Sequence, residues 1–147
     1  MKAKNHKKDW LANGHGVYTQ LFDEKEFFEM ASHTPNIVVL FYRTGNQGCR
    51  IMDWHLNILA AKHLEAKFCK LNIERAGFLQ KRLRIEVIPE ILLVKDSMTA
   101  DFVVGFQELD NFVAFSTEML ECRIARSGTI SYTGDLSKSS DVKRILG

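Results

Sequence analysis

The chain has 147 residues, 46% of them hydrophobic and 26% charged, a balance that favours one soluble globular domain over a disordered segment. No stretch approaches the roughly 18 consecutive apolar residues of a membrane span, and the lysine-rich start lacks the apolar run of a signal peptide. We therefore expect a cytoplasmic chain, or a nuclear one by diffusion, with no membrane partner.

The net charge of +2 is unevenly distributed along the chain. Residues 1–8 carry +4, residues 9–124 hold 12 basic and 16 acidic side chains and so carry −4, and residues 125–147 carry +2. A nucleic-acid groove needs its positive field on the folded surface. An acidic body with basic ends therefore argues against a nucleic-acid partner.

The first predicted elements lead into a central strand. Residues 13–16 form a glycine-containing loop that ends any helix entering from the lysine-rich start. A short strand is predicted over residues 17–21, after which Asp23 caps a helix with Glu26 in the capping-box position. Residues 37–42 are continuously apolar, which is typical of a strand buried on both faces of a sheet.

The middle of the chain continues the alternation of helices and strands. Apolar residues recur at helical spacing over 51–64, and residues 67–73 alternate as a strand. A short amphipathic helix is predicted over 78–84, and residues 87–94 read as another apolar strand that starts around a proline. These segments predict two further strands, each preceded by a helix.

The last elements are a strand over residues 102–106 and a helix over residues 109–124. The remainder is rich in Ser, Thr, Gly and Asp and lacks periodicity, so we expect it to lie outside the core. The predicted organisation is a basic stub over 1–13, a domain over 14–125 and an irregular tail over 126–147.

The order of these elements predicts an α/β fold. The strands at 37–42, 67–73 and 87–94 alternate with helices, and right-handed crossovers place such strands parallel. The strands at 87–94 and 102–106 are joined by a few residues and form an antiparallel hairpin. The expected sheet is mixed and five-stranded, a parallel half plus an antiparallel hairpin, between helical layers.

This arrangement resembles the thioredoxin fold over roughly residues 17–124. Residues 41–50 stand where thioredoxins carry their Trp-Cys-x-x-Cys loop, and residues 87–90 stand where they carry a cis-proline. The resemblance therefore implies a cis peptide bond between Ile88 and Pro89.

A closer resemblance, to the phosducin-like group of thioredoxin-like proteins, is carried by residues 14–18, 23–28, 62–68, 86–89, 103–106 and 117–121. Agreement on an exposed, chemically arbitrary stretch such as 23–28 is more specific than agreement on apolar residues that the fold requires. The resemblance implies a protein-binding domain that partners the cytosolic chaperonin folding actin and tubulin, and possibly its cytoskeletal clients, as a co-chaperone or modulator. Because members of the group carry a longer N-terminal helical arm, we expect residues 1–13 to be the end of such an arm and the chain to be a fragment.

Dithiol exchange needs an attacking thiolate and a second thiol that resolves the mixed disulfide. The degenerate loop of this chain consists of Asn46, Gln47, Gly48 and Cys49. The attacking position falls on Asn46, and only the resolving position, Cys49, is a cysteine. Leu40 or a neighbour stands where thioredoxins place a buried carboxylate. We therefore expect no catalytic residue and no oxidoreductase activity.

An alternative remains open, a monothiol redox or redox-sensing protein that uses Cys49. The thiol is predicted in the first turn of a helix, where the helix dipole and Arg50 favour the thiolate. Cys69 and Cys122 are expected to pack in the core as reduced thiols, because no CxxC pair is present. No metal or cofactor is expected.

The short helix over 78–84 is basic on its outer face. Lys81, Arg82 and Arg84 are either a solvated face or part of a partner-binding patch, and they are the partner-binding candidates. Phe78 and Phe106 are expected to pack in the core.

Overall fold

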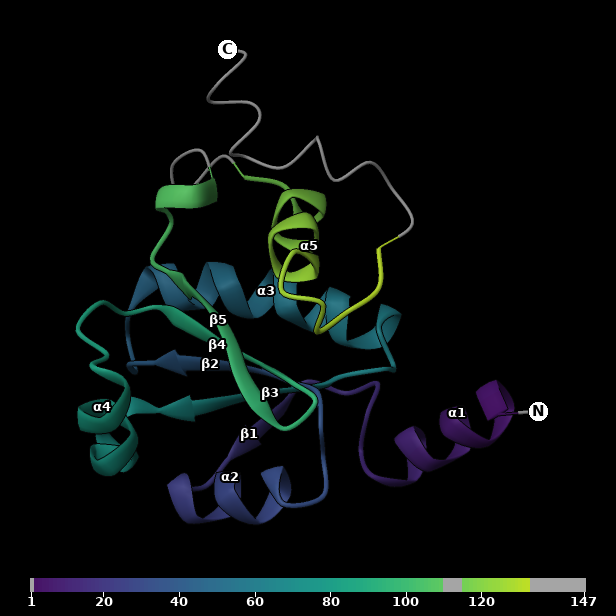
Figure 1. The fold of residues 1–147 in the computed structure, drawn as a ribbon. Coiled ribbons are helices and arrows are strands. Elements are labelled where there is room, and N and C mark those ends of the chain that lie inside the picture. Colours follow the sequence, from purple (N-terminus) through teal and green to yellow (C-terminus); the bar gives the residue numbers. More distant parts are fainter. Residues whose placement is uncertain (1, 110–114, 133–147) are drawn as a thin grey trace.

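The computed structural model describes residues 2–109 and 115–132, with side chains from residue 7 onward. One five-stranded sheet has the order β1-β3-β2-β4-β5. The strands are β1 (Thr19–Leu21), β2 (Ile37–Tyr42), β3 (Lys67–Asn72), β4 (Glu90–Lys95) and β5 (Met98–Val104). The helices are α1 (Lys2–Ala12), α2 (Glu24–Ala31), α3 (Gln47–Lys62), α4 (Gly77–Leu83) and α5 (Thr117–Ala125), with 3-10 turns η1 (Ile73–Arg75) and η2 (Gln107–Leu109). Figure 1 shows this arrangement, which confirms the predicted α/β class.

The sheet is mixed, as predicted, but its parallel half is composed differently. β1 and β2 both run parallel to β3, whereas β4 runs antiparallel to β2 and to β5. The expectation that the strand at 87–94 is parallel is therefore wrong. At about 1.5 Å per residue, the seven residues of α4 span roughly 10 Å, about half the roughly 20 Å of a six-residue strand. The chain thus begins β4 at the same end of the sheet at which β3 finishes, and β4 runs in the opposite direction to β3.

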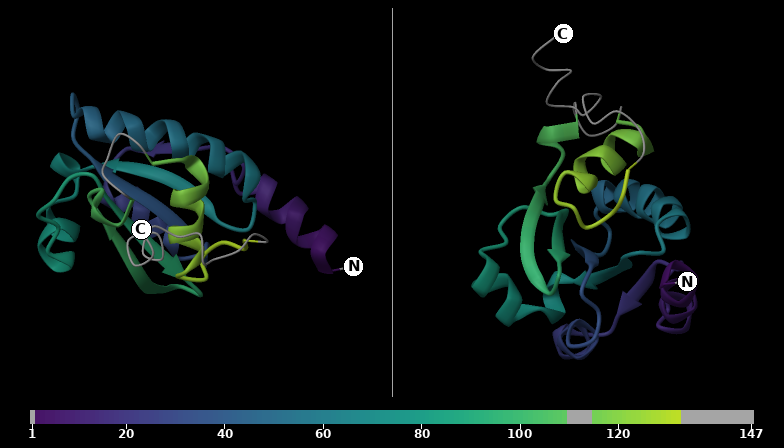
Figure 2. Two further views of the ribbon diagram at one scale, coloured as in Figure 1. Left: turned by 90° about the horizontal axis from the view of Figure 1, so that it is seen from above. Right: turned by 45° about the vertical axis from the view of Figure 1, so that its right-hand side comes forward.

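Each face of the sheet carries its own apolar layer. Leu40 and its alternate neighbours in β2 pack with α3 and α5, whereas Phe41 and its alternate neighbours pack with α2 and α4. All six residues of β2 are buried, as expected for the central strand. Figure 2 shows the helices on the two sides of the sheet.

Side-chain caps fix where two of the helices begin. Asp23 Oδ1 accepts a hydrogen bond of 3.0 Å from the Glu26 amide, and Glu26 Oε1 accepts one of 2.6 Å from the Phe22 amide. The first bond confirms Asp23 as the predicted cap of α2, whereas the Glu26 side chain reaches the amide of Phe22, one residue before the cap, and not that of Asp23 as in a regular capping box. Ser116 caps α5 in the same way, by accepting from the Met119 amide at 3.1 Å.

The C-terminal part differs from the predicted helix over 109–124. The chain instead forms η2 and then α5, with residues 110–114, and therefore the predicted core residue Phe112, outside the described part. Thr129 and Ile130 are buried, and Ile130 joins the cluster around α3 and α5. The expectation that residues from 126 onward lie outside the core is wrong for these two.

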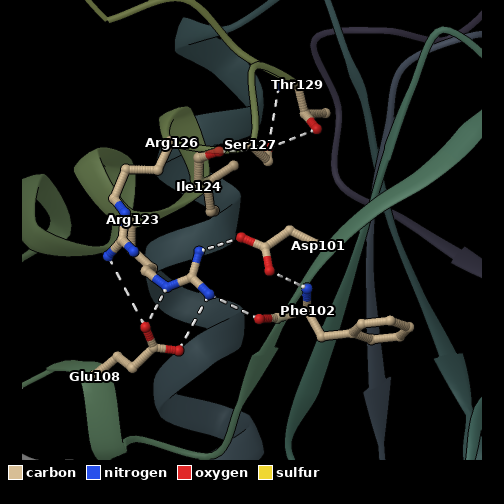
Figure 3. A network of polar contacts seen from close by, with 8 residues as sticks. All are labelled: Asp101, Phe102, Glu108, Arg123, Ile124, Arg126, Ser127 and Thr129. Atoms are coloured by element: carbon tan, nitrogen blue, oxygen red, sulfur yellow. Dashed lines mark hydrogen bonds and ion pairs between the residues drawn. The ribbon is translucent and has the colours of Figure 1, made fainter.

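Arg123 ties α5 to the last strand and to η2. Its guanidinium donates to Asp101 Oδ2 at 2.7 Å, to Glu108 Oε2 at 2.9 Å and to the Phe102 carbonyl oxygen at 2.8 Å, as Figure 3 shows. The side chain is 4% exposed. A buried guanidinium held on three sides in this way fixes α5 against the end of β5.

The basic N-terminal segment forms α1, which lies to one side of the sheet in both views (Figures 1 and 2). It ends at the predicted glycine loop, where His15 Nδ1 lies 2.8 Å from the Leu64 carbonyl oxygen. Among the described residues, no helix has the length and apolar character that a membrane crossing requires.

Candidate functional site

The degenerate loop joins β2 to α3, and its first residue is a helix cap. Asn46 has extended backbone angles, and its Oδ1 accepts a hydrogen bond of 3.0 Å from the Cys49 amide. The side chain at the attacking position of a dithiol loop is therefore used to satisfy a free amide of α3. Gln47 and Gly48 form the first residues of the helix, with Gln47 exposed.

Cys49 lies in the first turn of α3, as predicted, but it is only 2% exposed. Burial raises the pKa of the thiol above its ordinary value and the Asp53 carboxylate raises it further, although the backbone of Arg43 and the charge of Lys70 oppose this. The expected activation by the helix start is outweighed by desolvation. At neutral pH the group is a protonated thiol.

Phe106 covers this loop. A Cβ atom on Gly48 would lie 2.9 Å from Cε2 of Phe106, so only glycine leaves room for the ring at this point. Phe106 is partly buried against the cluster that contains Cys49, in agreement with its predicted core packing. The ring therefore contributes to shielding the start of α3.

A polar cluster beside Cys49 was missed by the sequence analysis. Asp53 accepts hydrogen bonds from the Tyr18 hydroxyl at 2.7 Å and from Lys70 Nζ at 3.1 Å, and the Lys70 ammonium lies 5.0 Å from the centre of the Tyr42 ring. Burial and the Asp53 carboxylate raise the pKa of Tyr18 far above its usual range. The only available sequence signal was that Asp53 lies one helical turn after Cys49.

Tyr42, Asp53 and Lys70 of this cluster line a cleft of about 340 Å³ at the loop. Arg43, Arg50 and Lys70 are its cations and Asp53 is its single carboxylate. The cleft presents polar groups beside the Cys49 side chain, but within the described part of the chain no group of three metal-ligating side chains occurs.

Pro89 is buried, and the peptide bond between Ile88 and Pro89 is cis, as the resemblance implied. Its carbonyl oxygen accepts a hydrogen bond of 2.9 Å from Gly105. The next residue, Glu90, is 5% exposed, and burial raises the pKa of its carboxyl to about 7. Ile88 packs against the cluster that holds Cys49, so the proline segment and the loop share that cluster.

The candidate basic residues lie elsewhere. Lys81, Arg82 and Arg84 are exposed on and after α4, on the opposite side of the sheet from α3. Phe78 is 59% exposed on the same helix, so its predicted core packing is wrong. The structure therefore separates the partner-binding candidates from the Cys49 loop.

Comparison with known proteins agrees with the fold. The sequence model of the Thioredoxin family matches residues 18–118. The chain is 63% identical to Phosducin-like protein 3 from Drosophila melanogaster over 98% of its length, and 47% identical to Thioredoxin domain-containing protein 9 from Homo sapiens over 92%. This chain belongs to the phosducin-like group of the thioredoxin family.

The chain covers 67% of the fly relative and 60% of the human one. Among solved structures it resembles thioredoxin f from spinach chloroplast, with a TM-score of 0.65 and 19% identity over 82% of this chain and 93% of that one. A thioredoxin from Nicotiana alata matches with a TM-score of 0.62 and 19% identity, covering 76% of this chain and 93% of that one. These two likenesses support the fold alone.

Proposed function

We propose that this phosducin-like chain is a redox-inactive protein-binding domain that acts as a co-chaperone or modulator of the cytosolic chaperonin. The observation that carries the redox-inactive assignment is Asn46, which occupies the attacking position of the dithiol loop and caps α3 with its side chain. An amide cannot attack a disulfide, and the remaining thiol of Cys49 is buried. The chaperonin follows from the resemblance to the phosducin-like group.

Disulfide reductase activity is the first test of this proposal. In an insulin-reduction assay we expect no turnover by the wild-type chain above a protein-free control, with a thioredoxin as the positive control. Asn46→Cys restores a dithiol and is expected to give slow exchange at most, because Leu40 or a neighbour stands where the resemblance places the buried acid of thioredoxins. Turnover by the wild-type chain would instead favour the monothiol alternative at Cys49.

Chaperonin binding is the second test. The immobilised chain and its Cys49→Ser variant are incubated in parallel with purified cytosolic chaperonin, and we expect both to retain it equally. Equal retention supports a scaffold role in which the thiol takes no part. Loss of binding only in Cys49→Ser would place the thiol in the interaction, and no binding by either would contradict the proposed partner.

The first candidates for contact with a partner are Lys81, Arg82 and Arg84. They are exposed, and none of them forms an ion pair with another residue in the described part of the chain. Cationic side chains without an internal partner are available to an acidic surface and strengthen its encounter at low salt. We place this activity in the cytoplasm, or in the nucleus by diffusion.

A further inference from the structure

An exposed aromatic ring on α4 contacts an exposed aromatic ring on α2. Phe78 of α4 is 59% exposed and Phe28 of α2 is 45% exposed, and their ring centres lie 6.0 Å apart in an edge-to-face contact. The Glu24 carboxylate accepts hydrogen bonds from the amides of Phe78 and Leu79, at 3.3 and 3.0 Å, which ties the start of α4 to α2. Single exposed apolar side chains are common, but two touching aromatic rings form a continuous apolar surface.

Positive charge lies on the α4 side of these rings, whereas α2 on the other side carries Glu24, Glu26 and Glu29 against Lys25. Residues 75–84 contain four basic side chains and no acidic one, although residues 9–124 as a whole carry −4. Lys81, Arg82 and Arg84 belong to this run. The surface is therefore a local cationic region on an acidic body, and it favours an anionic partner.

Two adjoining hollows lie along α4 and the residues that follow it. One, of about 440 Å³, is lined by Phe78, Lys81, Arg82 and Arg84. The other, of about 480 Å³, shares Lys81 and Arg84 with the first and is also lined by the buried Ile85. Each hollow thus combines an apolar side chain with cationic walls. One carboxylate, that of Glu86, is also present in the second hollow.

We propose that this surface, made by Phe28, Phe78, Lys81, Arg82 and Arg84, is a docking site for an acidic polypeptide segment that carries one large apolar side chain. The apolar side chain packs on the two rings, and the carboxylates of the segment pair with the three cations. Aromatic and arginine side chains together supply much of the energy of protein interfaces. The proposal rests on the proposed protein-binding function and names the chemistry of the bound segment.

The test uses a fluorescein-labelled peptide of twelve residues, in which two glutamates flank a central tryptophan on each side and the rest are serine and glycine. Binding to the full chain is followed by fluorescence anisotropy at 50 and 300 mM salt. We expect saturable binding that weakens at high salt, since exposed charge pairs are screened. A peptide with glutamine in place of glutamate, and one with alanine in place of tryptophan, should each bind at least about fivefold more weakly.

Variants locate the site on the chain. The triple change Lys81→Gln, Arg82→Gln and Arg84→Gln keeps helix-compatible side chains and should weaken peptide binding about fivefold or more, as should Phe78→Ala. The matched controls are Trp54→Ala, which removes a 63% exposed ring on α3, and the pair Arg43→Gln and Arg50→Gln at the cleft beside Cys49. Both controls should bind as the wild type does, and circular dichroism checks that every variant is folded.

Several results would overturn the proposal. These are equal binding by the triple variant and the wild type, equal binding of the glutamine peptide, and tighter binding of a single-stranded oligonucleotide than of the acidic peptide. Measuring chaperonin retention with the same variants separates the two proposals. If wild type and triple variant retain the chaperonin alike, this surface takes no part in chaperonin binding and the proposed partner still stands. If the chain binds the peptide but does not retain the chaperonin, only the proposed partner is contradicted.

Discussion

Cys49 combines a thiol with deep burial at the start of a helix, and its chemistry follows from that environment. Because burial raises its pKa, the nucleophilic thiolate is scarce at neutral pH. We predict that iodoacetamide labels Cys49 of the native chain at pH 7.4 at least about tenfold more slowly than it labels free cysteine. Peptide mass spectrometry distinguishes Cys49 from the two other cysteines, and labelling in urea is the control. Labelling at the rate of free cysteine would show that the thiol is accessible.

Phe41 and Phe78 are the same residue type in opposite environments, 0% and 59% exposed. Phe41→Ala opens a cavity between β2 and the helices α2 and α4 and should lower the free energy of unfolding by about 3–5 kcal/mol, out of the roughly 5–15 available to such a domain. Phe78→Ala should cost less than about 1 kcal/mol. Urea denaturation measures both, and a loss of under about 1 kcal/mol for Phe41→Ala would contradict its place in the core.

Arg123 holds three elements together through one side chain. Arg123→Met preserves much of the apolar stem but leaves the Asp101 and Glu108 carboxylates without their guanidinium. Since these acids are 36% and 32% exposed, water replaces part of the lost interaction, and we expect a loss of about 2–3 kcal/mol in the free energy of unfolding. Arg82→Met, at an exposed position on α4, is the control and should be close to neutral. Equal stability of the two variants would show that the network contributes nothing.

His63 joins the end of α3 to α5 and makes stability depend on pH. Burial alone would lower its pKa, but hydrogen bonds to Glu65 at 2.9 Å and Glu121 at 2.5 Å raise it above 6.5, and Lys62 also contacts Glu121 at 2.9 Å. A raised pKa in the folded state contributes stability that is complete below the unfolded pKa of about 6.5 and is lost as the pH rises through the folded value.

We therefore predict that the free energy of unfolding falls as the pH rises from 6 to 8, with one contribution from His63 and another from Glu90, whose raised pKa of about 7 lies in the same range, and that His63→Gln makes the decrease smaller. Chemical denaturation of both chains at several pH values measures the effect. His55→Gln is a control of opposite sign, because burial lowers the pKa of His55, whose ring contacts the hydroxyl of Thr117 at 2.7 Å, so its removal should make the fall with pH steeper. An unchanged slope in His63→Gln would assign the pH dependence to another group.

At the scale of the whole molecule, affinity for a large assembly is built from several weak contacts. The chain spans 67% of the length of its fly relative. When contacts are linked, losing one patch lowers the overall affinity steeply. We predict that a chimera with the additional segments of that relative binds the chaperonin at least about tenfold more tightly than this chain does. Surface plasmon resonance compares the two, and equal affinities would show that the described body carries the whole interaction.

The sequence alone determined the features that depend on local patterns. The apolar run at residues 37–42 predicted the central strand, and Asp23 predicted the cap of α2, because periodicity and capping act over a few neighbouring residues. The lack of a thiol at Asn46 is also visible in the sequence alone, and it is the ground on which we propose that dithiol exchange is absent. The cis bond before Pro89 came from the family resemblance, because local sequence by itself favours trans.

Only the tertiary structure decided what depends on contacts between distant segments. The antiparallel direction of β4 follows from how far α4 reaches, and the burial of Ile130 follows from packing against α3 and α5. Tyr18, Asp53 and Lys70 meet beside Cys49 from three separate segments of the chain, at separations of 35 and 17 residues, which no local pattern encodes. The exposure of Phe78 also depends on distant segments, because a ring on an amphipathic helix is buried only where another element covers it.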